Sequence, residues 1–191
     1  LYILNFFNGI KNTYFLKSNC VYPQLLNYEC FYPFWRRIGN LCADFIRTKN
    51  LKYSGYDIVI HIRKGDYISY GKRVFAKVNA SYYNDAIEII KEKNKITRPK
   101  CLFIGNDTQW AKDNIRRDID AYFQFDSEII DFHTLSNNKN VIVANSSFSY
   151  AAAMIACTTQ KNPLIICPEN YYTGKHYFGP LYHKNWIRVN N

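Results

Sequence analysis

The sequence predicts an α/β fold built on a doubly wound, Rossmann-like parallel sheet, and three observations support this. Short apolar runs typical of buried strands alternate with segments of helical periodicity. The connections are short, so successive parallel strands are expected to be joined by right-handed crossovers. Polar clusters follow several of the apolar runs, which is typical of strands that carry a binding site at their carboxyl ends.

In the first part of the chain the only helix predicted begins after Pro33. Apolar side chains recur there at three- and four-residue steps as far as Ile46. Gly55 ends the segment "NLKYSG", which breaks this pattern. We therefore place a domain boundary there, with a helical segment in residues 1–55 and a second domain in residues 56–191.

Residues 56–191 are expected to hold every strand of the sheet. Ser81 is the predicted N-cap of the first helix in this domain, and Asp107 that of the second. The segment from Glu169 onward is rich in aromatic residues, Gly and Pro, and we expect it to pack over an edge of the sheet. The predicted strands cover residues 56–62, 100–106, 121–125, 140–145 and 163–168. The predicted helices cover residues 80–94, 107–119 and 147–159, with a short helix or turn at 131–138.

The composition is that of a basic, aromatic-rich globular chain. The net charge is +10 and 17% of the residues are aromatic, which excludes a disordered chain. A diffuse positive charge favours an anionic ligand such as a phosphate ester, a nucleic acid or an anionic membrane surface, without choosing among them. The six cysteines lack the spacing of zinc ligands, so we expect no metal and predict buried free thiols.

The first polar cluster follows the first predicted strand. Arg63 offers a planar fork of donors suited to phosphate oxygens, and Lys64 adds a second positive charge. Asp66 can hold the Arg63 guanidinium in place or act as a base. His61 can donate to a phosphate or orient a neighbour. A surface salt bridge beside a buried histidine is an equally good interpretation of this pattern.

Two further clusters follow later strands. Asn145, Ser146 and Ser147 lie between an apolar strand and an apolar helix, where hydroxyls and backbone N–H groups could surround an anion. Helix capping by one of the two serines is the alternative. Asp107 follows "FIGN" and is more typical of a cap than of a ligand contact. The chain carries no GxGxxG fingerprint, no P-loop and no GxSxG elbow.

Four stretches occur together in an order and spacing that resemble the α-1,2-fucosyltransferases, glycosyltransferase family 11. They are "HIRKGDY" at 61–67, "SYYNDAI" at 81–87, "LFIGNDTQWAKDN" at 102–114 and "VIVANSSFSYAAAMI" at 141–155. The resemblance covers roughly residues 56–191. Its paired HxRxGD and ANSSFS motifs are far more specific together than either is alone.

The resemblance implies a GT-B type enzyme that moves L-fucose from GDP-β-L-fucose to the 2-hydroxyl of a galactose-containing glycan. It implies inversion at the sugar, with no metal and no cofactor beyond the donor substrate. Arg63 would contact the β-phosphate of the donor with His61 beside it, and Lys64 would add to donor binding. Asp66 is our candidate for the base by its chemistry. The other donor-binding residues carried over are Asp107, Asn145, Ser146, Ser147 and Ser149.

This sequence departs from the family pattern at several positions. Lys64 stands where the family most often has a second arginine, and Asn106 stands where it has a carboxylate. The glycine-rich "GGLGNQ" type of N-terminus does not occur in this chain. We therefore expect residues 1–55 to be a remnant of the acceptor-side domain, and the chain by itself to turn over poorly.

Two other functions remain open from the sequence. One is a transferase that uses another nucleotide sugar or acts on protein hydroxyls. The other is a basic module that binds nucleotide or nucleic acid without catalysis, although we expect no nucleic-acid partner because the basic residues are dispersed. A bacterial enzyme would be cytoplasmic or peripheral to the inner membrane. A Golgi or other membrane location in a eukaryote is less favoured, because the sequons at Asn106 and Asn145 fall inside site motifs.

Overall fold

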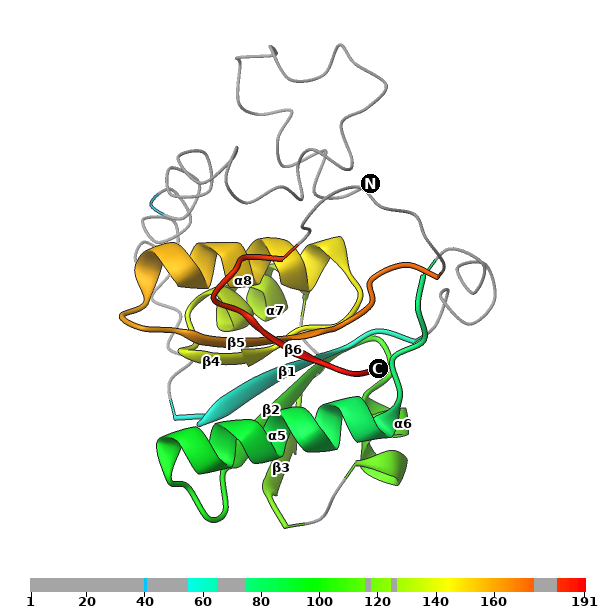
Figure 1. Ribbon diagram of the computed structural model, residues 1–191. Helices are drawn as coiled ribbons and strands as arrows, with labels where there is room; N and C mark the ends of the chain where they lie inside the picture. The colour runs from blue at the N-terminus through cyan, green and yellow to red at the C-terminus, as the bar shows by residue number, and fades with distance from the viewer. Residues whose placement is uncertain (1–39, 41–54, 65–74, 116–117, 125–126, 174–181) are drawn as a thin grey trace.

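The computed structural model describes residues 40, 55–64, 75–115, 118–124, 127–173 and 182–191. These residues form one parallel sheet between two layers of helices (Figure 1). Nearly all of the predicted helical segment in the first 55 residues lies outside the described residues, so that domain boundary stays a prediction. None of the helices in the described part is long and apolar enough to cross a membrane.

Strands and helices alternate along the described chain from residue 58 to residue 168, as the sequence predicts. The strands are β1 (Ile58–Ile62), β2 (Lys100–Gly105), β3 (Asp120–Phe123), β4 (Asn140–Ile142), β5 (Leu164–Pro168) and β6 (Ile187–Val189). The helices are α5 (Ala80–Asn94), α6 (Thr108–Asn114), α7 (Glu128–Ser136) and α8 (Ser147–Thr159). The predicted bounds of α5 and α8 are confirmed residue for residue.

The sheet is doubly wound. Its strands lie in the order β3-β2-β1-β4-β5-β6, and every pair is parallel. The chain therefore builds outward from β1 to β3, returns to the other side of β1, and builds outward again to β6. This confirms the predicted fold class. It also creates a topological switch point between β1 and β4, where ligands of open α/β sheets bind.

Alternating side chains of the strands build two separate cores. Ile58 and Ile60 of β1 pack beneath α5 and α6, whereas Val59 packs against α7 and α8 on the other face. Figure 1 shows these two helical layers on opposite sides of the sheet. The run Ala151–Ala153 in α8 is buried in the second core, where its small side chains allow close packing on the sheet. The three described cysteines carry free thiols, as expected.

The structure differs from the prediction at three element ends. Asn79, not Ser81, caps α5: its Oδ1 accepts a hydrogen bond of 3.0 Å from the Tyr82 N–H, and Ser81 donates to the same oxygen. Helix α6 ends at Asn114, five residues earlier than predicted. The C-terminal segment extends the sheet with β6, beside β5, instead of only packing over the edge.

The end of β2 requires a glycine. Gly105 has φ +117°, a conformation that L side chains rarely adopt. A Cβ at this position would overlap the carbonyl oxygen of Ile62, the residue paired with it across the sheet. The absence of a side chain therefore lets the ends of β1 and β2 lie side by side.

We predict that Gly105→Ala lowers the free energy of unfolding by about 2–4 kcal/mol, because backbone strain and a steric clash act together. Gly55→Ala is the matched control, since Gly55 also has a positive φ of +125° but a Cβ there would have no heavy atom within 4 Å. Urea denaturation of the two variants measures the difference. Equal losses would contradict a steric role for the contact with Ile62.

Candidate functional site

The three predicted polar clusters lie at the carboxyl ends of three adjacent strands. β1 has β2 on one side, with Ile62 paired to Gly105, and β4 on the other, with Ile60 paired to Ile142. Parallel strands end at the same edge of a sheet, so the clusters after β2, β1 and β4 share one edge. The residues that follow β1 and β4 flank the switch point.

His61 and Phe148 connect the first cluster to the third. The His61 ring lies in β1 and contacts the Phe148 ring in the first turn of α8, with centroids 5.3 Å apart. Burial, together with the nearby positive charge of Arg63, lowers the pKa of His61 to about 3. The imidazole is therefore neutral at physiological pH. Asp66, the candidate base, lies outside the described residues.

Lys64 and Asp107 connect the first cluster to the second. The backbone N–H of Lys64 donates to Oδ2 of Asp107 at 3.1 Å. Asp107 occupies the N-cap position of α6 but makes no capping hydrogen bond with its side chain. The predicted cap is therefore confirmed for the position of Asp107 at the start of α6 but not for its side chain. The Asp107 carboxylate instead accepts a hydrogen bond from the backbone that follows β1.

The side chain of Lys64 points into the layer of α5 and α6. Its Nζ donates to the carbonyl oxygen of Val78 at 2.5 Å and lies 3.6 Å from the centroid of the Trp110 ring. Only 8% of the residue is exposed. Burial and the charge of Lys77 lower the pKa of Lys64 to about 8, against the opposing effect of Asp107.

The third cluster is organised by hydrogen bonds at the start of α8. Asn145 is buried, and its Nδ2 donates to the carbonyl oxygens of Ala76 at 2.6 Å and Asn170 at 3.2 Å. Ser146 is the N-cap of α8 and accepts from the N–H of Phe148 at 3.3 Å. Capping by a serine, the alternative left open by the sequence, is thus confirmed for this residue.

Ser147 of the third cluster and Ser149, two residues further along α8, differ in exposure. Ser149 is fully buried, and its Oγ accepts from the N–H of Ala144 at 3.3 Å, which fixes the turn between β4 and α8. Ser147 is partly exposed at the first position of α8. The backbone N–H groups of a helix's first turn lack intrahelical partners and favour anions. Ser147 is accordingly the serine of this cluster best placed to meet a ligand.

Two tyrosines of α5 contribute to the same strand ends and were not predicted as functional. The Tyr82 hydroxyl oxygen lies 2.6 Å from the carbonyl oxygen of Val143 after β4, and the Tyr83 hydroxyl lies 3.3 Å from that of His61 in β1. The helical period of residues 80–94 places Tyr83 on a core face of this helix. Both are buried there, but the helical period gives no sign that their hydroxyls reach the sheet edge.

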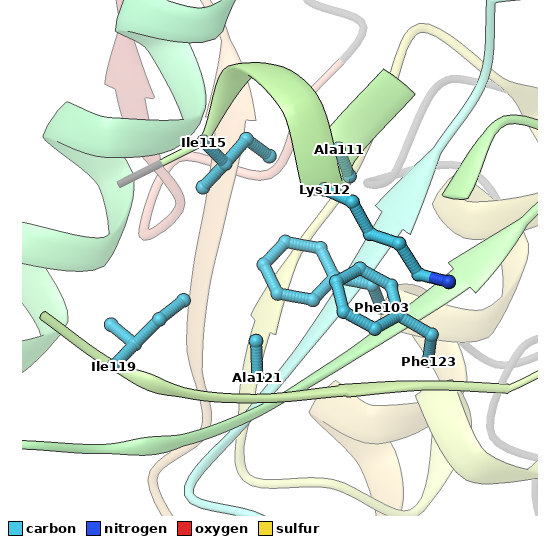
Figure 2. A pocket seen from close by; sticks show the side chains of 7 residues that line it. All are labelled: Phe103, Ala111, Lys112, Ile115, Ile119, Ala121 and Phe123. Atoms are coloured by element: carbon cyan, nitrogen blue, oxygen red, sulfur yellow. The ribbon is translucent and has the colours of Figure 1, made fainter. Parts of the chain in front are cut away.

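A separate cavity of about 230 Å³ lies beside α6 and the edge strand β3 (Figure 2). The rings of Phe103 and Phe123 stack in its wall with centroids 5.1 Å apart, and Lys112 lies 4.8 Å from the centroid of Phe123. None of the predicted site residues lines it. Its walls carry mainly apolar groups, so it lacks the polar atoms that a diphosphate would need.

The described residues contain no group of three or more His, Cys, Asp or Glu side chains that could hold a metal ion. Residues 65–74, which include Asp66, are not among the described residues. A metal-free reaction therefore stays a prediction.

Comparison with known proteins gives the chain its family. The model of Glycosyl transferase family 11 matches residues 36–190. The O-antigen biosynthesis glycosyltransferase WbnK of Escherichia coli is 26% identical over 157 residues, which are 78% of this chain and 50% of that protein. An alpha-1,2-colitosyltransferase of Escherichia coli is 29% identical over 160 residues, 77% of this chain and 50% of its own length.

This chain thus spans about half the length of the curated relatives that it matches. No solved structure matches it significantly. The family match covers most of the sequence and includes every described strand and helix from β1 to β6. The chain is a member of glycosyl transferase family 11, as the motifs at the strand ends suggest.

Proposed function

We propose that this chain is the donor-binding half of an inverting α-1,2-fucosyltransferase, which moves L-fucose from GDP-β-L-fucose to the 2-hydroxyl of a galactoside. The observation that carries the proposal is the pairing of β1 with β4, because it brings Arg63 and the N-terminus of α8 to one edge of the sheet. A diphosphate at the switch point would lie between them.

This arrangement suits the charge that develops in the reaction. Cleavage of the glycosyl bond leaves additional negative charge on the departing GDP. A guanidinium and a helix N-terminus fixed in advance stabilise that charge without reorganisation at the moment of reaction. Arg63 supplies the first and α8 the second. Ser147, partly exposed at the helix start, can add a hydroxyl donor to the same oxygens.

Inversion also requires a base that accepts the proton of the acceptor hydroxyl. His61 does not fit this role, because burial keeps its imidazole a very weak base. We assign it instead to packing against Phe148 beside Arg63. Asp66 stays our candidate for the base by its chemistry, because it is the carboxylate of the first cluster and a carboxylate can accept a proton.

The comparisons favour one alternative donor. One relative is an alpha-1,2-colitosyltransferase, which shares the proposed linkage but transfers a different sugar. A colitosyl donor is therefore the second candidate for this site. Both relatives come from Escherichia coli, which supports a bacterial enzyme. For such an enzyme we propose a location that is cytoplasmic or peripheral to the inner membrane.

We predict that Arg63→Ala weakens GDP binding about 10- to 150-fold, the effect of losing a charge-assisted contact worth about 1.5–3 kcal/mol. Isothermal titration calorimetry with GDP measures the change. Arg98→Ala is the matched control, because Arg98 precedes β2 at the opposite edge of the sheet and pairs with exposed Asp120. Equal affinities for wild type and the Arg63 variant would remove the basis of the proposal.

Donor identity is tested by competition. We expect GDP-L-fucose to displace a labelled GDP probe, and UDP-glucose to fail at the same concentration. A GDP-linked colitose is included in the same panel. Tighter binding of the colitosyl donor than of the fucosyl donor would replace the proposed sugar while leaving the family assignment intact.

The protonation of His61 gives a prediction that depends on pH. Its imidazole NMR signals should not titrate between about pH 5 and 8, because its pKa is lowered from 6.5 to about 3. The unfolded chain takes up this proton near pH 6.5, so the stability linked to the neutral form is present above that pH and lost as pH falls toward 3. A His61→Gln variant assigns the signals. Titration near pH 6.5 would show that the ring is solvated.

A further inference from the structure

Three consecutive backbone carbonyls before α5 each accept a hydrogen bond from a different side chain. We call residues 76–78 the strap. The carbonyl oxygen of Ala76 accepts from Asn145 at 2.6 Å, and that of Val78 accepts from Lys64 at 2.5 Å. Between them, the Lys77 carbonyl oxygen accepts from the side-chain amide of Asn191 at 3.1 Å.

The donors of these hydrogen bonds come from different strand ends. Lys64 follows β1 and Asn145 follows β4, so the strap joins the two strands that flank the switch point. Asn191 follows β6, the last strand in the sheet. The strap therefore runs across the same edge that carries the candidate site.

The strap is held on its other side by the segment after β5. The N–H of Ala76 donates to the carbonyl oxygen of Tyr171 at 3.0 Å, and Phe75 and Tyr172 form an isolated antiparallel bridge. The rings of Phe75 and Tyr172 stack with centroids 5.7 Å apart. The strap is thus a fixed piece of backbone to which the ends of β1 and β4 can be attached.

Lys64 and Asn145 are aimed into the protein by these contacts. The ammonium of Lys64 is enclosed by the Val78 carbonyl and the Trp110 ring. Both hydrogens of the Asn145 amide have backbone acceptors, on Ala76 and Asn170, and the residue is 1% exposed. Because only 8% of Lys64 and 1% of Asn145 is exposed, a donor phosphate would have little access to either group.

We propose that Lys64 and Asn145 are positioning residues that set the separation of Arg63 from the N-terminus of α8 by attaching both strand ends to the strap. This inference rests on the proposed function, because it concerns the same diphosphate site. It replaces the direct donor contacts that the motif resemblance implied for these two residues. Lys64 acts by positioning Arg63, the residue before it. Asn145 acts by positioning Ser146, the residue after it and the N-cap of α8.

The first test is the affinity for GDP of Lys64→Met and Lys64→Arg, measured by calorimetry at several salt concentrations and well below each variant's unfolding temperature. We expect Lys64→Met to weaken binding about fivefold or more. The salt dependence should equal that of wild type, because no ion pair with the ligand is lost. Lys64→Arg should restore most of the affinity, since a guanidinium can also donate to Val78 and stack on Trp110.

Lys161→Met serves as the matched control, because Lys161 is exposed and precedes β5 at the opposite edge of the sheet. It removes one charge without touching the strap. A reduced salt dependence in Lys64→Met alone would show that Lys64 contacts the phosphates directly. Unchanged affinity in that variant would show that its contacts only support the fold. Either result would overturn the inference.

The second test is a double-mutant cycle with Asn145→Leu, which removes both amide donors. If both residues act through the strap, the double variant Lys64→Met/Asn145→Leu should lose less affinity than the two single losses predict together. Hydrogen exchange of the Ala76 amide should also speed up in each single variant without any ligand. Additive losses with an unchanged Ala76 amide would contradict a shared strap.

The outcomes separate the inference from the proposed function. If wild type does not bind GDP, the proposed function fails and the inference fails with it. If wild type binds GDP and Arg63→Ala does not, while both strap variants bind like wild type, only the inference fails.

Discussion

The parallel pairing of β1 with β4 is the constraint on which the site depends. Two strands far apart in the sequence lie side by side because the chain winds outward from β1, returns and winds outward again. The pairing of Ile60 with Ile142 brings the polar residues that follow each strand to one edge. Gly105 sets the approach of β2 on the other side, since a side chain there would displace Ile62. The positions of the polar residues at this edge therefore depend on how the strands pack in the sheet.

The alternation of side chains explains why neighbouring basic residues differ in role. Lys64 contacts Trp110 in the layer of α5 and α6, where its ammonium donates to the carbonyl oxygen of Val78 and its backbone N–H donates to Asp107. The charge of Arg63 instead acts on His61, whose ring contacts Phe148 of α8. Successive residues of an extended chain point to opposite sides, so adjacent cations reach different layers. We propose the ligand role for Arg63, whereas the contacts of Lys64 hold the strand end in place.

The sequence predicts the fold and brings the three polar clusters of the candidate site to one sheet edge, because both depend on local patterns. Apolar runs, helical periods and polar residues at strand ends indicate the strands from β1 to β5, the bounds of α5 and α8, and the three clusters, but they do not indicate β6. The direction of each polar group depends on distant residues and could not be predicted. The ammonium of Lys64 donates to the carbonyl oxygen of Val78, in the segment before α5. The side-chain amide of Asn145 donates to the carbonyl oxygen of Ala76, 69 positions away. Asn79 caps α5 in preference to Ser81, a choice between two adequate caps that only the turn geometry decides.

The central claim is that Arg63 and the first turn of α8 meet one diphosphate at the switch point. Amide NMR of the labelled chain during a GDP titration tests it most directly. We expect the signals of Arg63, Ser147 and Phe148 to shift together along one binding curve, and guanosine without phosphates to shift them much less. Shifts confined to the cavity lined by Phe103 and Phe123, or separate curves for Arg63 and Ser147, would contradict the claim.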